Sequence, residues 1–324
     1  MSQRQDRAPG EGNQEGRDLL GTVVVPLDGS EFGEQVVPLV EELARRADRN
    51  TELHLVHVHV SVPVFLEGIA TVNPELERDR EELEEQYLSA VRDNLSSRWP
   101  GTVRTALLHG PIDETVERYA KEEGAGLVAM TTHGRGGLSR MWLGGVAHRL
   151  IRRLGSPLLL HRPEDGVPAP PDLNGPILVA LDGSKTAEAA LGPAASLARA
   201  LKSPLHLIRV LPPFFFVGNP TLASGRTGSQ EARAQLTDAA QEYLDRVVAA
   251  LIEGGVEARG GILYDVPAAQ GILDTANEVG AGLVAMATHG RGGLSLALMG
   301  SVADKVVRSA ERPVLLLRPE SGKG

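Results

Sequence analysis

Two stretches of this 324-residue chain repeat one another almost letter for letter. Residues 124–139 read GAGLVAMTTHGRGGLS and residues 280–295 read GAGLVAMATHGRGGLS, so 15 of the 16 positions are identical. A second matching pair lies near the start of each half, with VVVPLDGS at 23–30 and ILVALDGS at 177–184. The offset is 154 residues for this pair and 156 for the other, so the two halves have almost the same length. The sequence therefore predicts one domain that occurs twice.

The boundaries of the two domains follow from composition. The N-terminal residues are polar and show no periodicity, which is typical of a disordered tail. Between the halves lies RPEDGVPAPPDLNG, a proline-rich stretch that indicates a semi-rigid linker. We therefore expect a tail at 1–18, domain 1 at 19–161, a linker at 162–175, domain 2 at 176–319 and a short tail at 320–324.

The composition excludes several classes of protein and site. The chain has no cysteine, which rules out a disulfide framework, a thiolate zinc site and a cysteine nucleophile. The 33 basic and 42 acidic residues give a net charge of −9, whereas general nucleic-acid binders normally carry a basic face. No apolar run approaches the ~20 residues of a membrane-spanning helix, and the N-terminus has no apolar signal segment. We expect a cytoplasmic protein that binds neither nucleic acid nor membrane.

Apolar runs alternate with helical patterns in each half. In domain 1 we expect a helix with Leu83, Tyr87, Val91 and Leu95 on one face, because these residues are spaced by four. Near-continuous Val/Leu strands that alternate with helices are typical of a parallel sheet covered on both faces. Each half is therefore predicted to be a doubly wound α/β domain with five strands. The strands of domain 1 are expected at 20–27, 53–60, 102–108, 127–130 and 157–161.

Domain 1 has an acidic stretch and a group of histidines, and we interpret both as structural features. The acidic stretch at 75–85 is interpreted as the solvated face of a helix. The strand ELHLVHVHV carries His57 and His59 on one face. A metal site needs ligands that converge from several elements, so a structural role is favoured for these histidines.

The loops after the first and fourth strands are the expected place for a ligand, because open α/β sheets bind ligands where the strand order reverses. Asp28-Gly29-Ser30 follows the first strand, and a glycine-rich loop follows the fourth. Such glycines let backbone N–H groups approach an oxyanion. Further on, Gly144-Gly145 precedes a helix whose N-terminus favours anions. The two elements predict a phosphate cradle, although each alone also fits a tight turn that reverses the chain.

Other nucleotide motifs fit poorly. The chain has no G-x-x-x-x-G-K-[ST] loop. A near match to G-x-G-x-x-G begins at Gly134, but it follows the fourth strand instead of the first, which disfavours dinucleotide binding.

These motifs resemble those of the universal stress protein family. LDGS follows the first strand, M-x-T-H-G-R-G-G-L-S follows the fourth, and G-[S/G]-V-A and a final apolar strand complete each half. The resemblance covers nearly all of both halves and implies a tandem member. Family members are flavodoxin-like, Rossmann-like α/β domains similar to adenine nucleotide hydrolases. One branch binds ATP through G-x2-G-x9-G-[S/T]; the other lacks this pattern and does not bind ATP.

Both halves depart from the ATP pattern. Thr131 and Ala287 replace its first glycine, and Gly145 replaces the final Ser or Thr in domain 1, whereas domain 2 keeps Ser301. A lost neutral hydroxyl contact weakens phosphate binding by about 0.5–1.5 kcal/mol without removing the backbone donors. We therefore expect domain 2 to be the better ATP site.

The resemblance also assigns roles to single residues. It places Asp28 and Asp182 beside the adenine and ribose, where either carboxylate could hold Mg²⁺ through water, and places the backbone of Val58 and Val210 at the adenine edge. No nucleophile, base and orienting group come together in the sequence, so no catalytic residue is assigned. A lone carboxylate is a weak metal site, so no resident metal is assigned either. The remaining expected ATP contacts are Ser30, Thr131, His133, Gly134, Arg135, Gly144, Gly145 and Val146 in domain 1, and Ser184, Ala287, His289, Gly290, Arg291, Gly292, Gly300, Ser301 and Val302 in domain 2.

We therefore expect an ATP-binding regulator or sensor of the stress response. The alternatives are a nucleotide-free scaffold that acts through partners or another small ligand, and a very slow ATPase. Because family members pair through the last strand of the sheet, the two domains are expected to form an intramolecular pseudo-dimer. Such tandem chains can pair again as a homodimer.

Overall fold

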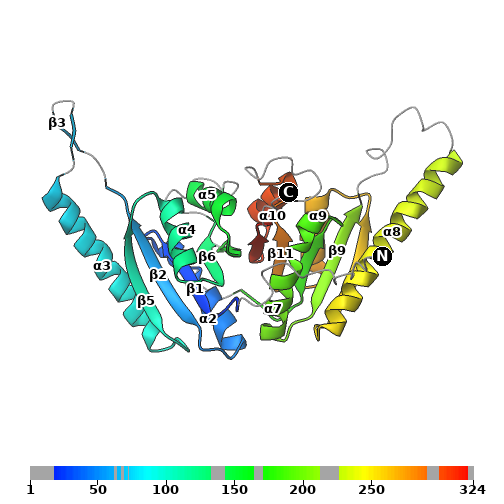
Figure 1. Cartoon of the computed structure of the whole chain (residues 1–324), viewed down its shortest axis with the longest axis horizontal. Coiled ribbons are helices and arrows are strands. Elements are labelled where there is room, and N and C mark those ends of the chain that lie inside the picture. The colour runs from blue at the N-terminus through cyan, green and yellow to red at the C-terminus, as the bar shows by residue number, and fades with distance from the viewer. Residues whose placement is uncertain are drawn as a thin grey trace, which may run out of the picture. The chain divides into compact units, whose positions relative to one another are not determined.

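The chain divides into two compact units, with the boundary between Pro170 and Pro171 (Figure 1). We refer to them as domain 1 and domain 2 and treat each by itself. The structure is a computed structural model, and it describes residues 18–61, 64–66, 69–71, 73–132, 143–163, 171–211, 226–289 and 299–319.

Domain 1 is built on a five-stranded parallel sheet in the order β7-β6-β1-β2-β5. The order reverses between β1 and β6, which is the doubly wound arrangement. The predicted fold class is confirmed, and each predicted strand begins and ends within two residues of the observed one. The strands are β1 (Thr22–Leu27), β2 (Glu52–His59), β5 (Val103–His109), β6 (Leu127–Thr131) and β7 (Leu158–His161). A small antiparallel pair, β3 (Val64–Leu66) and β4 (Ile69–Thr71), was not predicted.

The helices of domain 1 cover both faces of this sheet. Residues on opposite faces of a strand are an odd number of positions apart, as are His54 and His59 in β2. His54 Nδ1 lies 2.9 Å from Tyr119 Oη of α4, whereas His59 Nδ1 lies 2.7 Å from Glu84 Oε2 of α3, so these two helices cover opposite faces. The helices are α1 (Glu31–Glu34), α2 (Val37–Arg46), α3 (Pro74–Ser96), α4 (Ile112–Glu122) and α5 (Gly145–Arg153).

Domain 2 repeats this architecture. Its sheet has the order β10-β9-β8-β11-β12, again with parallel neighbours. The strands are β8 (Ile177–Leu181), β9 (Leu205–Leu211), β10 (Ala258–Tyr264), β11 (Leu283–Ala287) and β12 (Val314–Leu317). The helices are α6 (Lys185–Glu188), α7 (Leu191–Leu201), α8 (Arg226–Glu253), α9 (Ala268–Glu278) and α10 (Ser301–Ser309).

The face that α3 turns to the sheet differs from the predicted one. Leu95 is buried, but Leu83 is 64% exposed. An α-helix advances 100° per residue, so steps of four drift by 40° and place Leu83 about 120° away from Leu95. The buried positions instead include Glu77, Leu88 and Leu95, with Glu84 half-buried on the same row. Charged side chains therefore face the sheet in the first half of α3.

Candidate functional site

The Asp-Gly-Ser turn after β1 fixes a carboxylate at the strand end. Ser30 donates two hydrogen bonds to Asp28 Oδ1, from its backbone N–H at 3.0 Å and from its hydroxyl at 2.5 Å. The same hydroxyl accepts a hydrogen bond from Gly33 N at 3.0 Å and so caps α1. Gly29 has φ +78°, a conformation that L side chains rarely adopt. The turn thus holds Asp28 in one orientation.

A backbone hydrogen bond closes the loop between β6 and α5. Gly144 N donates to Thr132 O at 2.8 Å, and α5 begins at the next residue. Domain 2 has the same closure, with Gly300 N donating to Thr288 O at 2.8 Å directly before α10. The predicted helix N-terminus of domain 1 and its counterpart in domain 2 are therefore observed beside the end of the fourth strand. Six predicted ligand residues inside these loops lie outside the described residues: His133, Gly134, Arg135, Gly290, Arg291 and Gly292.

Domain 1 has a cavity of about 350 Å³ where its strand order reverses. The lining comes from the ends of β1, β2 and β6, from α3 and from the first residues of α4 and α5. Ser30 is not in the lining, but it holds Asp28, which is. The structure thus brings together the parts that the sequence predicted separately. The predicted residues that line the cavity are Asp28, Val58, Thr131, Gly144, Gly145 and Val146.

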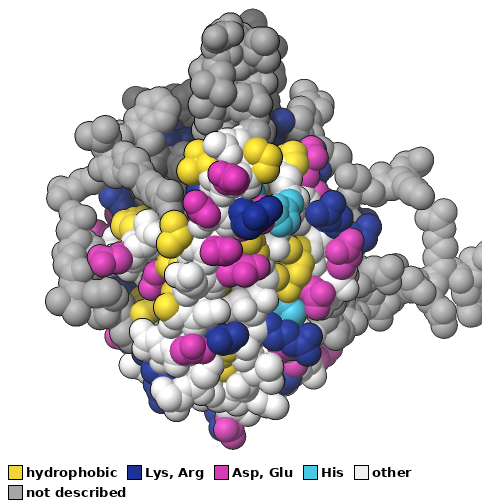
Figure 2. All heavy atoms as spheres, turned by 90° about the vertical axis from the view of Figure 1, so that its left-hand side faces the viewer, with side chains coloured by type: hydrophobic (Ala, Val, Ile, Leu, Met, Phe, Trp, Pro, Cys, Tyr) yellow, Lys and Arg dark blue, Asp and Glu magenta, His cyan; other side chains and the backbone are white. Residues whose placement is uncertain are grey.

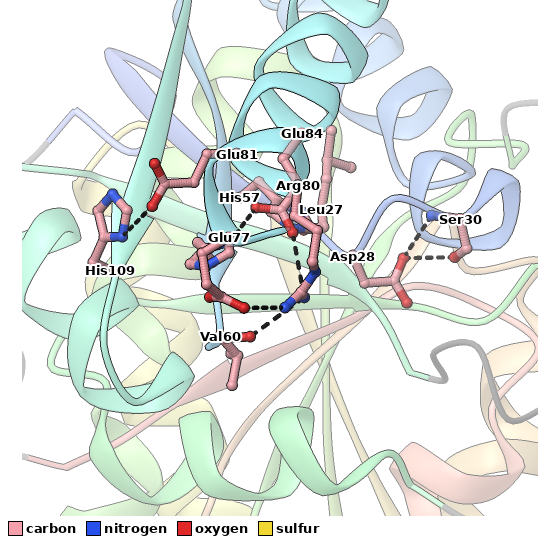
Figure 3. A network of polar contacts seen from close by, with 11 residues as sticks. Leu27, Asp28, Ser30, His57, Val60, Glu77, Arg80, Glu81, Glu84 and His109 are labelled. Atoms are coloured by element: carbon pink, nitrogen blue, oxygen red, sulfur yellow. Dashed lines mark hydrogen bonds and ion pairs between the residues drawn. The ribbon is translucent and has the colours of Figure 1, made fainter. Parts of the chain in front are cut away.

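Of the lining residues that were not predicted as ligand contacts, three have ionisable side chains: His57, Arg80 and Glu84. Arg80 and Glu84 lie on the face of α3 that is turned to the sheet, beside the histidines of β2 (Figure 3). Two spacings in the sequence could have indicated this wall. Glu77 and Glu84 are seven residues apart and so share one helix face, and His57 and His59 share one strand face.

The charged residues of this wall bind one another. His59 lies 2.7 Å from a carboxylate oxygen at each of its ring nitrogens, with Glu84 at Nδ1 and Glu77 at Nε2. Arg80 donates to Glu77 Oε1 at 3.1 Å and to Val60 O at 3.3 Å. His57 donates from Nδ1 to Leu27 O at 2.9 Å. The favoured structural role of the histidines thus has a physical basis in these bonds.

The outer surface of this region carries charges of both signs. Figure 2 shows acidic and basic side chains interspersed on the face of domain 1 that carries α3 and β5. Two such pairs involve residues of β5: Arg104 pairs with Glu52 at 2.6 Å, and His109 lies 3.8 Å from Glu81. Exposed pairs of this kind contribute little to stability. On α3, the charged residues that a ligand would contact are Arg80 and Glu84, because they line the cavity.

In domain 2 the predicted residues occupy the corresponding strand ends. Ser184 donates to Asp182 Oδ1 from its backbone at 2.9 Å and from its hydroxyl at 2.6 Å. His289 is buried, and its Nδ1 lies 3.0 Å from Thr288 Oγ1. Burial and the charge of Arg318 lower the pKa of His289 below its usual value. Val210 is the last residue but one of β9, and Ala287 ends β11. Gly300 caps α10, and Ser301 and Val302 are its first two residues.

One buried side chain distinguishes domain 2 at this place. Arg209 pairs in register with Leu181, as His57 pairs with Leu27 in domain 1. Arg209 is 8% exposed, and its guanidinium carbon lies 5.3 Å from the ring centre of Tyr243 on α8. Domain 2 therefore places an arginine at the strand position where domain 1 has a histidine.

Comparisons with known proteins bear directly on this duplicated site. A family model described as the universal stress protein family matches residues 20–162 and again residues 174–318. The chain belongs to the universal stress protein family. This universal stress protein is 31% identical over 208 residues to one from Mycobacterium tuberculosis, and the match covers 64% of this chain and 66% of the relative, just under two thirds of its length. Another from M. tuberculosis is 28% identical over 316 residues, covering 91% of this chain and 94% of the relative.

Solved structures support the fold. A universal stress protein from Archaeoglobus fulgidus superposes with a TM-score of 0.64 at 18% identity, covering 92% of this chain and 98% of that one. At this identity the likeness concerns the fold alone. Among the helices that the structure describes, none is both long and apolar enough to traverse a bilayer.

Proposed function

We propose that this universal stress protein binds adenine nucleotides, ATP in particular, and acts as a regulator or sensor of the stress response whose conformation depends on nucleotide occupancy. The observation that carries the proposal is the cavity of domain 1, because it lies at the reversal of strand order and is lined by the residues that the family pattern selects. Its volume of about 350 Å³ suits a small ligand.

Each part of a nucleotide has a matching part of this cavity. The first N–H groups of a helix have no acceptor within the helix and carry a partial positive charge. Gly145, Val146 and Ala147 begin α5 and line the cavity, so they suit the phosphates. Asp28, oriented by Ser30, suits the ribose hydroxyls, and the backbone of Val58 suits the adenine edge.

Domain 2 is proposed to bind ATP as well, and more tightly. Its strand order and its closed β11–α10 connection match those of domain 1. Ser301 adds a hydroxyl at the helix start, where domain 1 has Gly145. The smaller Ala287 stands where domain 1 has Thr131.

Titration calorimetry of the full chain with ATP, with and without Mg²⁺, tests the proposal. Gly300→Val with Gly290→Val should remove the tighter site, because a Cβ at Gly300 would stand 3.1 Å from the carbonyl oxygen of Thr288. We expect the affinity of that site to fall by more than about tenfold, a loss of at least ~1.4 kcal/mol. Gly144→Val with Gly134→Val should remove the weaker site.

A matched control uses a glycine with free space around it. A Cβ at Gly192 would meet nothing within 4 Å, so Gly192→Val should bind ATP like the unmodified chain. The absence of binding at millimolar ATP would overturn the nucleotide proposal and favour the scaffold. ATP hydrolysis above the blank, lost in the glycine variants, would instead favour the slow ATPase.

A further inference from the structure

A buried histidine in domain 1 is held between two carboxylates of one helix. His59 is 3% exposed, and the side chains of Glu77 and Glu84 are 11% and 19% exposed. Glu84 Oε2 lies 2.7 Å from Nδ1 of His59, and Glu77 Oε2 lies 2.7 Å from Nε2. We call this arrangement the Glu77–His59–Glu84 bridge. It joins the end of β2 to two positions of α3 that lie about two turns apart.

The bridge requires a proton on His59. An ionised carboxylate only accepts hydrogen bonds, and a neutral imidazole carries one N–H donor and one acceptor. Both nitrogens of His59 must therefore carry hydrogen when both glutamates are ionised. Arg80 donates to Glu77 Oε1 at 3.1 Å and thereby favours the ionised form of that glutamate.

The charges around His59 favour this proton. Burial lowers the pKa of His59, but the hydrogen bonds to Glu77 and Glu84 and the charges of these groups raise it by more, so that its pKa lies above the ordinary value of 6.5. Opposing groups are present on each neighbouring element: Arg80 on α3, His57 on the same strand, and His109 on β5 with its ring centre 5.5 Å away. Glu81 of α3 lies beside His109 at 3.8 Å, and Asp28 faces the same cavity from the end of β1.

The bridge reaches the cavity through two side chains. Glu84 and Arg80 both line it, and they lie 3.9 Å apart. When His59 loses its proton, one carboxylate faces the lone pair of a ring nitrogen instead of a donor. A half-buried carboxylate without its donor is costly, so Glu84 or Glu77 must turn away, and Arg80 loses one of its two carboxylate partners. The wall of the cavity then changes shape and charge.

Domain 2 offers a built-in comparison. Its counterparts of His57 and His59 on β9 are Arg209 and Leu211. Aligning Tyr87-Leu88 with Tyr243-Leu244 sets Arg233 and Ala240 at the positions of Glu77 and Glu84. Within its described residues, domain 2 therefore lacks the groups that make up the bridge.

We propose that the proton on His59 regulates nucleotide binding in domain 1: the protonated bridge fixes Glu84 and Arg80 in the cavity wall, and its loss weakens binding. This inference rests on the proposed nucleotide function and names the regulation of that same site. Since affinity depends on the proton, the bound nucleotide must raise the proton affinity of His59 by the same factor.

The test compares ATP affinity from pH 6 to 9 in the full chain with Gly290→Val and Gly300→Val, which leaves domain 1 as the binding site. The same measurement on this chain with His59→Gln corrects for the titration of ATP itself, since Gln does not titrate. We expect the ratio of the two affinities to fall by about fivefold or more as the pH rises. His109→Gln, at a neighbouring histidine whose side chain is 61% exposed, should leave that fall intact.

A second measurement needs no variant of the bridge. In the ligand-free full chain, NMR should show His59 titrating above pH 6.5, and saturating ATP should move that titration upward. A ratio that stays flat from pH 6 to 9, or a fall that His109→Gln abolishes, would overturn the inference while the nucleotide function stands. No ATP binding at any pH would instead overturn the proposed function; in that case, titration of His59 at or below pH 6.5 would overturn the bridge as well.

Discussion

Two buried histidines of domain 1 respond to acid in opposite ways. His59 lies between carboxylates, and its pKa is raised. His161 ends β7, is 6% exposed, and its Nδ1 makes no hydrogen bond within the described part of the chain. Burial lowers the pKa of His161 to about 4. His161 is therefore neutral at pH 7, and the stability of domain 1 falls in acid because the buried imidazole resists protonation.

Replacing His161 with leucine should make domain 1 less sensitive to acid. A histidine whose pKa falls from 6.5 to about 4 on folding contributes stability at neutral pH that is lost as the pH falls through this window. Between pH 7 and pH 5 the loss amounts to about 1–2 kcal/mol. Leu317, at the corresponding register position of β12, indicates that leucine fits such a place.

Urea unfolding at pH 7 and pH 5 checks this expectation. Both tryptophans, Trp99 and Trp142, belong to domain 1, so their fluorescence follows that domain. His109→Leu, at an exposed histidine, is the control and should keep the acid sensitivity of the unmodified chain. If His161→Leu loses as much stability between the two pH values as the unmodified chain, the assignment to His161 is wrong.

At the scale of single elements, the exposure of its leucines shows which face of α3 packs on the sheet. Leu88 is 2% exposed, whereas Leu83, one of the leucines predicted for the buried face, is 64% exposed. Leu88→Ala should destabilise domain 1 by about 2–5 kcal/mol, because it removes buried methyl groups and leaves a cavity. Leu83→Ala should stay within about 0.5 kcal/mol of the unmodified chain.

Urea unfolding followed by tryptophan fluorescence measures both variants of α3. The comparison is matched, because the same side chain is shortened on the same helix. Equal losses in the two variants would contradict the observed orientation of α3, and a larger loss for Leu83→Ala would restore the four-residue face that the sequence suggested.

The strands and the loop ends could be predicted from sequence because their signals are local. Near-continuous Val/Leu runs, the glycine of an Asp-Gly-Ser turn and a serine cap each act within a few residues. Asp28 and Gly144 could therefore be assigned to one place, whereas Val58 was assigned there through the resemblance to the family. The charged wall could not, because runs such as 75–85 usually lie in water. Only the packing of α3 across β2 turns Glu77 and Glu84 toward a histidine.

At the scale of the whole molecule, the two domains have sheets with the same strand order, but different side chains stand at the carboxyl ends of their strands. The residues next to Val58 and Val210, which are predicted to contact the adenine, differ: domain 1 has His57 and domain 2 has Arg209. The common backbone is the basis for proposing one ligand class for both domains, and the different side chains would allow separate responses.

The predicted pseudo-dimer through the last strands can be tested by hydrogen exchange. If β7 and β12 pair with a neighbouring strand on their outer edges, their amides should exchange much more slowly than those of β5 and β10, the opposite edge of each sheet. Mass spectrometry of the full chain after deuterium labelling measures this difference. Comparable exchange at both edges would contradict the pairing.

The bond from Gly144 N to Thr132 O and its counterpart from Gly300 N to Thr288 O have a practical meaning for protein engineering. Each fastens the two ends of a segment of equal length, residues 133–143 and 289–299, to an identical frame. Because their lengths and closing hydrogen bonds match, we expect that the two segments can be exchanged as cassettes between the domains. Such chimaeras would separate what the exchanged segment contributes to the proposed ligand choice from what the surrounding half contributes.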